Sequence, residues 1–186
     1  MNNLNGMKCY SAGPMDYYSH SEAKSWRAKL SNFLTSRGCF MLSPLDKPSN
    51  DPDIAETEED REKLTRLKLE GDFDEVERIM KKVCQMDLKM VDHSDFVVAQ
   101  VNVNVHMCGT YDEIYFNELH RHPTLVFVEG GKGNAPNWLY GRVKHQNIFG
   151  SLDEVIEHLK WVDQTPGIEV RKVNKRWFFF DHSKMR

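Results

Sequence analysis

The sequence predicts a single α/β domain: a mainly parallel sheet of about five strands flanked by helices, flavodoxin- or Rossmann-like, with a C-terminal β-hairpin. The first observation behind this prediction is that short apolar runs alternate along the chain with longer segments of helical spacing. The second is composition, because 186 residues with 40% hydrophobic and 28% charged residues are typical of one globular domain with a substantial core. We therefore expect residues 1–186 to form one domain.

The strands are predicted from short apolar runs that end at turn-forming residues. They are expected at residues 7–12, 39–42, 96–101 and 124–128. Gly13 follows the first run and Gly130 follows the last, which marks the ends of both. Residues 168–173 and 176–180 alternate in polarity on either side of a turn, which predicts a terminal hairpin within residues 166–186.

The helices are predicted from apolar side chains that recur at a period of 3.6 residues. They are expected at residues 21–37, 61–70, 74–91, 109–120 and 151–162. Gly38 and Gly71 stop the first two helices, and Ser151 with Glu154 gives the capping-box pattern that opens the last. Residues 46–60 are polar and predict a loop between the second strand and the second helix.

Charge and cysteine spacing exclude several classes of partner and cofactor. The net charge of −3 arises from 25 basic and 28 acidic residues, so no strong basic field is present to hold a nucleic-acid polymer. No run approaches the roughly 18 apolar residues of a membrane span. The four cysteines form no C-x-x-C pair, so neither a zinc site nor a redox motif is predicted. We expect a cytoplasmic protein with reduced thiols, no metal and no organic cofactor.

Several carboxylates are expected near the carboxyl ends of the strands, where parallel sheets bind their ligands. Asp87 and Asp95 flank the approach to the third strand, and Glu113 opens the following helix. Cleavage of a glycosidic bond requires one carboxylate to attack the sugar carbon and another group to protonate the departing atom. A carboxylate in the first turn of a helix is held as an anion, which favours Glu113 as the nucleophile. The simpler alternative is a structural role, since acids are common in first turns.

Three ordered segments resemble the nucleoside 2-deoxyribosyltransferase superfamily, which also includes nucleoside 5′-monophosphate N-glycosidases. They are Cys-Tyr-Ser-Ala-Gly-Pro-Met at residues 9–15, the Asp-Leu helix and Ser-Asp-x-x-x-Ala strand within residues 86–99, and Gly-Thr-Tyr-Asp-Glu-Ile at residues 109–114. The resemblance covers most of residues 8–128. Residues 51–82 are longer than a minimal member of the superfamily requires, which leaves the substrate open.

The resemblance implies a role for each matching residue. Glu113 falls at the nucleophile, which forms a covalent glycosyl intermediate in a retaining two-step reaction. Asp87 matches an aspartate that handles the base or the sugar hydroxyls, and Tyr10 matches a tyrosine that positions the nucleophile. Asn137 lies in a segment where members carry an asparagine that reaches a neighbouring subunit's site, which implies a homo-oligomer; the alternative is a turn asparagine.

Five further residues are candidates for substrate binding. Ser11 and Gly13, with nearby amides, are placed to meet a 5′-phosphate, and Gly109 opens the helix of the nucleophile. Asp95 is a candidate with a structural alternative, as a turn former at the entry to a strand. His106 lies close to the expected site and is a candidate for the base or a phosphate, with polar surface as the alternative.

The expected activity is cleavage of the N-glycosidic bond of a small (deoxy)nucleoside or nucleoside 5′-monophosphate. Transfer of the sugar to a second base makes the protein a deoxyribosyltransferase, and transfer to water makes it an N-glycosidase. Two alternatives stay open: a nucleotide-binding sensor without turnover, and a glycosidase acting on a dinucleotide cofactor. The sequence does not choose between transfer and hydrolysis, or between nucleoside and monophosphate.

Overall fold

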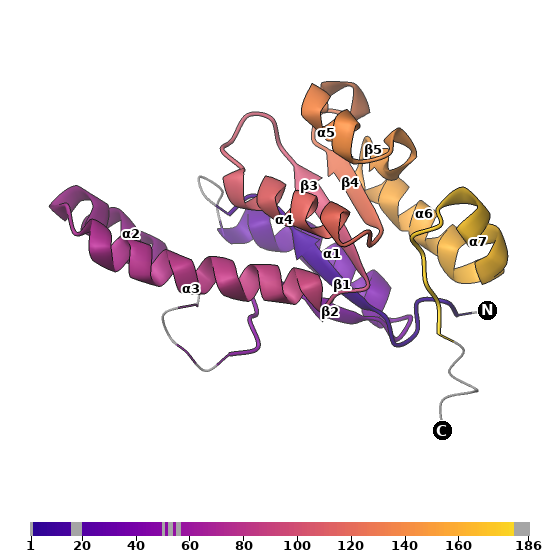
Figure 1. The fold of residues 1–186 in the computed structure, drawn as a ribbon, viewed down its shortest axis with the longest axis horizontal. Helices are drawn as coiled ribbons and strands as arrows, with labels where there is room; N and C mark the ends of the chain where they lie inside the picture. Colours follow the sequence, from indigo (N-terminus) through magenta and orange to yellow (C-terminus); the bar gives the residue numbers. More distant parts are fainter. Residues whose placement is uncertain (1, 16–19, 50, 52–53, 55–56, 181–186) are drawn as a thin grey trace.

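A computed structural model describes residues 2–15, 20–49, 51, 54 and 57–180 of the chain (Figure 1). Its centre is one sheet of five parallel strands in the order β2-β1-β3-β4-β5. This is the flavodoxin-like order, so the predicted fold class is confirmed. The strands are β1 (Lys8–Ala12), β2 (Phe40–Leu42), β3 (Phe96–Val101), β4 (Thr124–Val128) and β5 (Ile148–Phe149).

Both faces of the sheet are covered by helices, as is required when every strand is parallel. The helices are α1 (His20–Thr35), α2 (Glu58–Glu70), α3 (Phe73–Asp92), α4 (Cys108–Leu119), α5 (Asn137–Arg142), α6 (Leu152–Gln164) and α7 (Gly167–Val173). One core cluster joins a sheet face to α1 and α6, and the second joins the other face to α3, α4 and α5. β3 and β4, both fully buried, read as continuous apolar runs for this reason.

The alternation of side chains along each strand decides which face a residue serves. Tyr10 and Ala12 of β1 belong to the cluster under α3 and α4, whereas Cys9 belongs to the cluster under α1 and α6. Tyr10 pairs in register with Leu42 of β2 and Val97 of β3. The phenol ring is therefore fixed from both sides near the middle of the sheet.

The predicted C-terminal hairpin is wrong for the residues that the structure describes. Residues 167–173 form α7, which follows Pro166, and residues 176–180 form no strand. Trp177 is fully buried and its ring lies 5.2 Å from that of Phe96. The segment is thus held by packing of Trp177 beneath β3 rather than by cross-strand pairing, and a short apolar alternation does not distinguish these arrangements. Residues 181–186 lie outside the described residues. The fifth strand is instead β5, at residues 148–149.

The predicted polar loop at residues 46–60 ends earlier than expected. Thr57 caps α2 through a reciprocal pair with Asp60, so residues 58–60 are helical. Residues 50, 52–53 and 55–56 of this loop lie outside the described residues.

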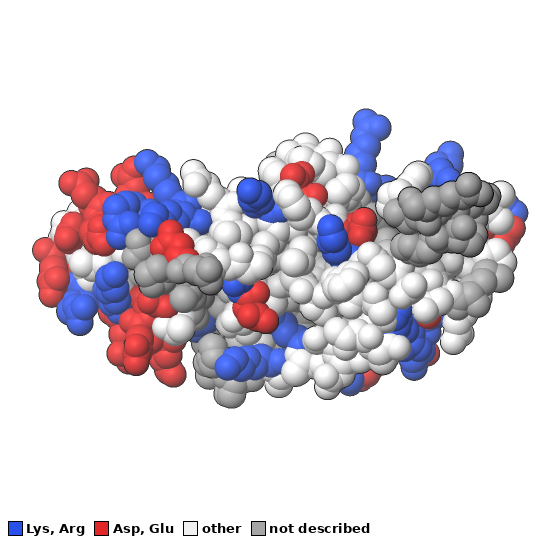
Figure 2. Space-filling model, turned by 90° about the horizontal axis from the view of Figure 1, so that it is seen from below, with Lys and Arg blue, Asp and Glu red and all other residues white. Residues whose placement is uncertain are grey.

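A helical hairpin made by α2 and the outer part of α3 projects from the body of the domain (Figure 1). None of the thirteen residues of α2, all of them described, is buried. Charged side chains of both signs gather on this end of the molecule (Figure 2). The inner part of α3 is different, because Met90 and Val91 are buried against the sheet. Across the described residues, none of the helices is long and apolar enough to cross a membrane.

Candidate active site

A buried tyrosine–carboxylate pair lies between the sheet and α4. The hydroxyl of Tyr10 donates a hydrogen bond of 2.5 Å to Oε1 of Glu113. Tyr10 is fully buried and Glu113 is 8% exposed. Ile114, the next residue of α4, is buried in the cluster that also contains Tyr10, which fixes the helix against β1. A carboxylate in such surroundings requires a donor, and the phenol supplies one.

The position of Glu113 on its helix differs from the prediction. α4 begins at Cys108, so Glu113 is its sixth residue, and the first turn, which is fully described, holds no acidic side chain. The field of the helix N-terminus acts within the first turn and does not account for this carboxylate. Burial beside Tyr10, rather than the field of the helix N-terminus, accounts for the position of the Glu113 carboxylate. The helix starts after a turn in which the amide of Asn102 donates to the sulfur of Met107 over 3.1 Å.

Asp87 lies on the buried stripe of α3, with Val83 one turn before it and Val91 one turn after. Its Oδ1 is 3.0 Å from Nζ of Lys47. The side chains are 14% exposed for Asp87 and 3% exposed for Lys47, so this ion pair is largely removed from water. Lys47 comes from the loop after β2, the strand beside β1, and α3 packs beside α4. The pair therefore lies on the same sheet face as Tyr10 and Glu113.

Arg27, which the sequence analysis missed, organises the end of β1. Its guanidinium, 4% exposed, donates to the carbonyl oxygens of Ser11, Gly13 and Ala23 at 3.3, 3.1 and 2.8 Å. It also lies 4.5 Å from the centre of the Trp26 ring. A side chain at Gly13 would place its Cβ 2.8 Å from Cζ2 of Trp26, so glycine is required by close packing. The available signal was an arginine beside a tryptophan on an apolar helix face.

The other predicted binding residues have different surroundings. Ser11 belongs to the opposite sheet face from Tyr10, and its hydroxyl donates to the carbonyl of Leu42 over 3.4 Å. Gly109 is the second residue of α4, and a Cβ added there would have no described atom within 4 Å. His106 is exposed just before α4, and Asn137 is exposed at the start of α5. Gly109, His106 and Asn137 thus follow the carboxyl ends of the strands in the chain, at or before the starts of α4 and α5.

Asp95 lies at the other end of the sheet. It precedes Phe96, the first residue of β3, and its Oδ2 accepts a 2.7 Å hydrogen bond from the amide of Lys8 at the start of β1. The amide of Asp95 donates in turn to the carbonyl of Lys8. This reciprocal contact joins the amino ends of two strands, which is the structural role that the sequence left open for Asp95.

Burial makes Cys9 and Cys39 poor alternatives to the carboxylate as nucleophiles. Cys9 and Cys39 are buried, and burial raises the pKa of both thiols, that of Cys39 to about 12. A thiol of this kind carries no thiolate at neutral pH and is a weak nucleophile. Within the described part of the chain, no three histidine, cysteine or acidic side chains are grouped to hold a metal ion.

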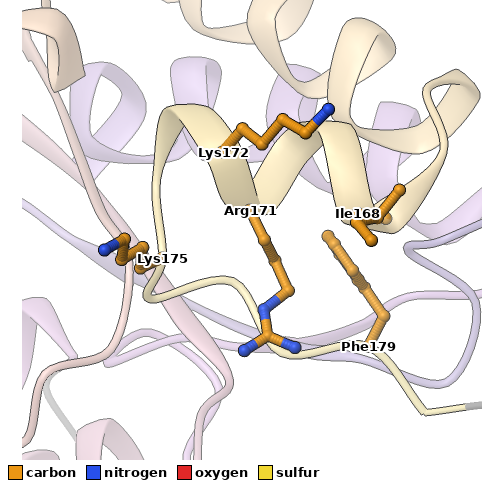
Figure 3. A pocket seen from close by; sticks show the side chains of 6 residues that line it. Ile168, Arg171, Lys172, Lys175 and Phe179 are labelled. Atoms are coloured by element: carbon orange, nitrogen blue, oxygen red, sulfur yellow. The ribbon is translucent and has the colours of Figure 1, made fainter.

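A cavity of about 570 Å³ opens beside α7, away from this pair (Figure 3). Phe179 points toward Ile168 there, with Arg171 extending alongside. None of the six described residues that line it carries a carboxylate. Val170 of the same helix packs into the cluster under α1 and α6, so the cavity belongs to the sheet face opposite Tyr10. It offers no nucleophile for glycosidic chemistry.

Comparison with solved structures finds three enzymes to which this chain is similar. A 2-deoxyribosyltransferase from Bacillus psychrosaccharolyticus has a TM-score of 0.50 at 18% identity, over 80% of this chain and 90% of that one. A CMP N-glycosidase from Clostridium botulinum has a TM-score of 0.48 at 12% identity, over 82% and 98%. A 2-deoxyribosyltransferase from Leishmania mexicana has 0.42 at 14% identity, over 66% and 64%.

Comparison with protein-family models and with curated protein sequences found no match. At 18% identity the likeness to the Bacillus enzyme establishes a common fold. The chain therefore shares the fold of a 2-deoxyribosyltransferase, which is the fold that the resemblance of its motifs implied.

Proposed function

We propose that this protein cleaves the N-glycosidic bond of a (deoxy)nucleoside or nucleoside 5′-monophosphate and passes the sugar to a second base, through a glycosyl ester on Glu113. The single observation that carries the proposal is the buried contact between Tyr10 and Glu113. The contact pairs one buried carboxylate with a phenol that can orient it, near the middle of a sheet of this fold. The ordered motifs supply the expectation that this carboxylate attacks.

The reaction has two displacements. In the first, a carboxylate oxygen of Glu113 bonds to C1′ while the C1′–N bond breaks and its electron pair leaves with the base. The departing base takes a proton from Asp87 or from a water that Asp87 holds. In the second, a nitrogen of another base attacks C1′ and loses a proton to water, which restores the original configuration and releases the Glu113 carboxylate. Water in place of that base gives hydrolysis, the second reaction that the same intermediate permits.

The chemistry of the sugar explains why a carboxylate suffices. The ring oxygen of the sugar stabilises the cation-like transition state, so this route requires no metal or organic cofactor. Tyr10 keeps the nucleophile in one orientation, which is the main task of a neighbour to an attacking group. Gly13 and the amides that follow β1 are the proposed neighbours of the 5′ position of the substrate.

A chromatographic screen tests the proposal. Deoxynucleosides, ribonucleosides and their monophosphates are incubated with the protein, with and without a second base, and free base and new nucleoside are measured. Glu113→Gln should abolish base release, and mass spectrometry of the wild type should show one added glycosyl group. Asp112→Asn is the matched control, because it removes the same charge at the exposed neighbouring position of α4. Full activity of Glu113→Gln would end the proposal, and ligand binding without an adduct or product would indicate a sensor.

We further propose a homo-oligomer in which Asn137 reaches a neighbouring copy's site. The supporting observation is that Asn137 and Trp138 are exposed at the start of α5, with Trp138 74% exposed. Mixing two inactive variants, Glu113→Gln and Asn137→Ala, tests this arrangement. Random exchange of subunits should restore about a quarter of wild-type activity, because one site in four receives both intact residues. No recovery in a mixture whose subunits exchange would contradict it.

A further inference from the structure

We propose that Lys47 is a positioning residue that keeps Asp87 in its anionic form, so that Asp87 acts in the site as a hydrogen-bond acceptor and not as the proton donor. The inference rests on the proposed function and specifies the source of the proton that the departing base takes. The electron pair of the broken C1′–N bond stays on the base nitrogen. That nitrogen then takes its proton from a water molecule, and the hydroxide that remains takes the proton that the incoming base loses when it attacks C1′.

The geometry of the pair is the first argument. Nζ of Lys47 is 3.0 Å from Oδ1 of Asp87, and the lysine side chain is 3% exposed. An ammonium group removed from water is stabilised by a counter-ion, and the Asp87 carboxylate lies beside it. The 14% of the Asp87 side chain that stays exposed gives a ligand access to the carboxylate while the cation holds Oδ1.

Charged groups of three segments bear on Asp87. Lys47, from the loop after β2, favours the anion. Glu113 lies on α4, which packs beside α3, and one of its oxygens accepts the hydrogen bond from the phenol of Tyr10. On α3 itself, Nζ of Lys82 lies 3.0 Å from Oδ2 of Asp51. Burial of a carboxyl group favours its neutral form, and the ammonium group of Lys47 at 3.0 Å favours the anion.

The position of Lys47 supports a role in the site beyond a structural one. It is five residues after Leu42, the last residue of β2, and Leu42 pairs in register with Tyr10. The loop that carries Lys47 thus leaves the sheet beside the strand that holds the tyrosine. α3, which carries Asp87, packs beside α4, which carries Glu113. One ion pair therefore links both segments that flank the proposed nucleophile.

The pH dependence of kcat/KM for base release separates the alternatives, measured for wild type, Lys47→Met and Lys47→Arg. If Asp87 acts as an anion, Lys47→Met should move the acid limb of the profile up by about 1–3 pH units. Activity is then lost at low pH and recovered at high pH, and Lys47→Arg keeps the wild-type profile. A proton donor predicts the reverse, an alkaline limb that moves up. Either that result or a loss that is uniform with pH would overturn the inference.

Lys82→Met is the matched control, because it breaks a more exposed lysine–aspartate pair on the same helix. Its kcat/KM profile should overlie that of the wild type.

A second readout does not depend on activity. In protein labelled with ¹³C at the aspartate carboxyl carbons, the Asp87 resonance is identified by its loss in Asp87→Asn. It should show an ionised carboxylate from about pH 5 to pH 8 in wild type and titrate within that range in Lys47→Met. Titration of Asp87 above about pH 6 in wild type overturns the inference, whether or not base is released. An ionised Asp87 in a protein that releases no base would instead reject the proposed function.

Discussion

Replacing Tyr10 with phenylalanine tests the central contact of the proposed site. The substitution keeps the ring in the core and removes the hydroxyl that donates to Glu113 over 2.5 Å. A hydrogen bond to a charged group contributes about 1.5–3 kcal/mol. At about 1.4 kcal/mol for each factor of ten, its loss corresponds to roughly 10- to 150-fold. We expect kcat/KM for base release to fall by a factor in this range.

The same change should lower the free energy of unfolding, because Glu113 is 8% exposed and loses its phenol donor. We expect a decrease of about 1–3 kcal/mol near neutral pH, measured by urea unfolding. The decrease should shrink in acid, where Glu113 is protonated and the lost bond no longer stabilises a buried charge.

Tyr115→Phe is the control, since it removes a phenol hydroxyl from a half-buried tyrosine on the same helix as Glu113. It should retain the kcat/KM of the wild type within about twofold, which is the size of effect of a change outside the reacting groups. If Tyr10→Phe also stays within twofold of the wild type in kcat/KM and unfolds at the same urea concentration, the tyrosine neither orients nor stabilises the nucleophile. The reasoning from the Tyr10–Glu113 contact would then be refuted.

Three further predictions concern stability. Gly13→Ala should lower the free energy of unfolding in urea by about 1–3 kcal/mol, because its Cβ would meet Trp26. Gly109→Ala should leave the free energy of unfolding unchanged or raise it by up to about 1 kcal/mol. Equal effects of the two substitutions would contradict the packing argument. Asp95→Ala should cost about 1 kcal/mol and leave kcat/KM unchanged, and a tenfold loss of activity would return Asp95 to the site. Burial lowers the pKa of His158 from its ordinary value of 6.5, so unfolding free energy should decline as pH falls below about 6.5, and His158→Gln should flatten that decline. An unchanged slope in His158→Gln would exclude this histidine as the cause.

Much of the fold could be predicted because periodicity reports on burial. β3 and β4 are buried at every position, so their apolar runs were recognisable without any knowledge of their neighbours. β5 was not predicted, because two residues, Ile148 and Phe149, carry no period of their own. The C-terminal segment failed for a related reason. Its conformation is decided by Trp177 packing beneath Phe96, a contact between residues 81 positions apart that leaves no local pattern.

Part of the candidate site could likewise be predicted from the sequence, and part of it could not. Glu113, Tyr10 and Asp87 were predicted from motifs, which can be recognised in the sequence alone. Lys47 was not predicted, because its proposed role depends on a partner forty positions along the chain, and an isolated lysine in a polar loop is normally taken as solvated. The helix-terminus argument for Glu113 failed because Glu113 is the fifth residue even of the predicted helix at 109–120, and the sixth of α4, so it lies beyond the first turn.

The projecting hairpin of α2 and α3 has a practical consequence for anyone who needs to label this protein. Its turn at Gly71 adopts a left-handed conformation with nothing within 4 Å of a Cβ position, and Leu69 beside it is 85% exposed. Asp87 lies about 21 Å along α3 from its first residue, Phe73, at 1.5 Å for each residue. Peptide tags or fluorescent reporters inserted at this turn should be accommodated without disturbing the sheet. The turn of this hairpin is therefore a site at which a tag can immobilise the domain, or a fluorescent reporter can follow it, while its activity is measured.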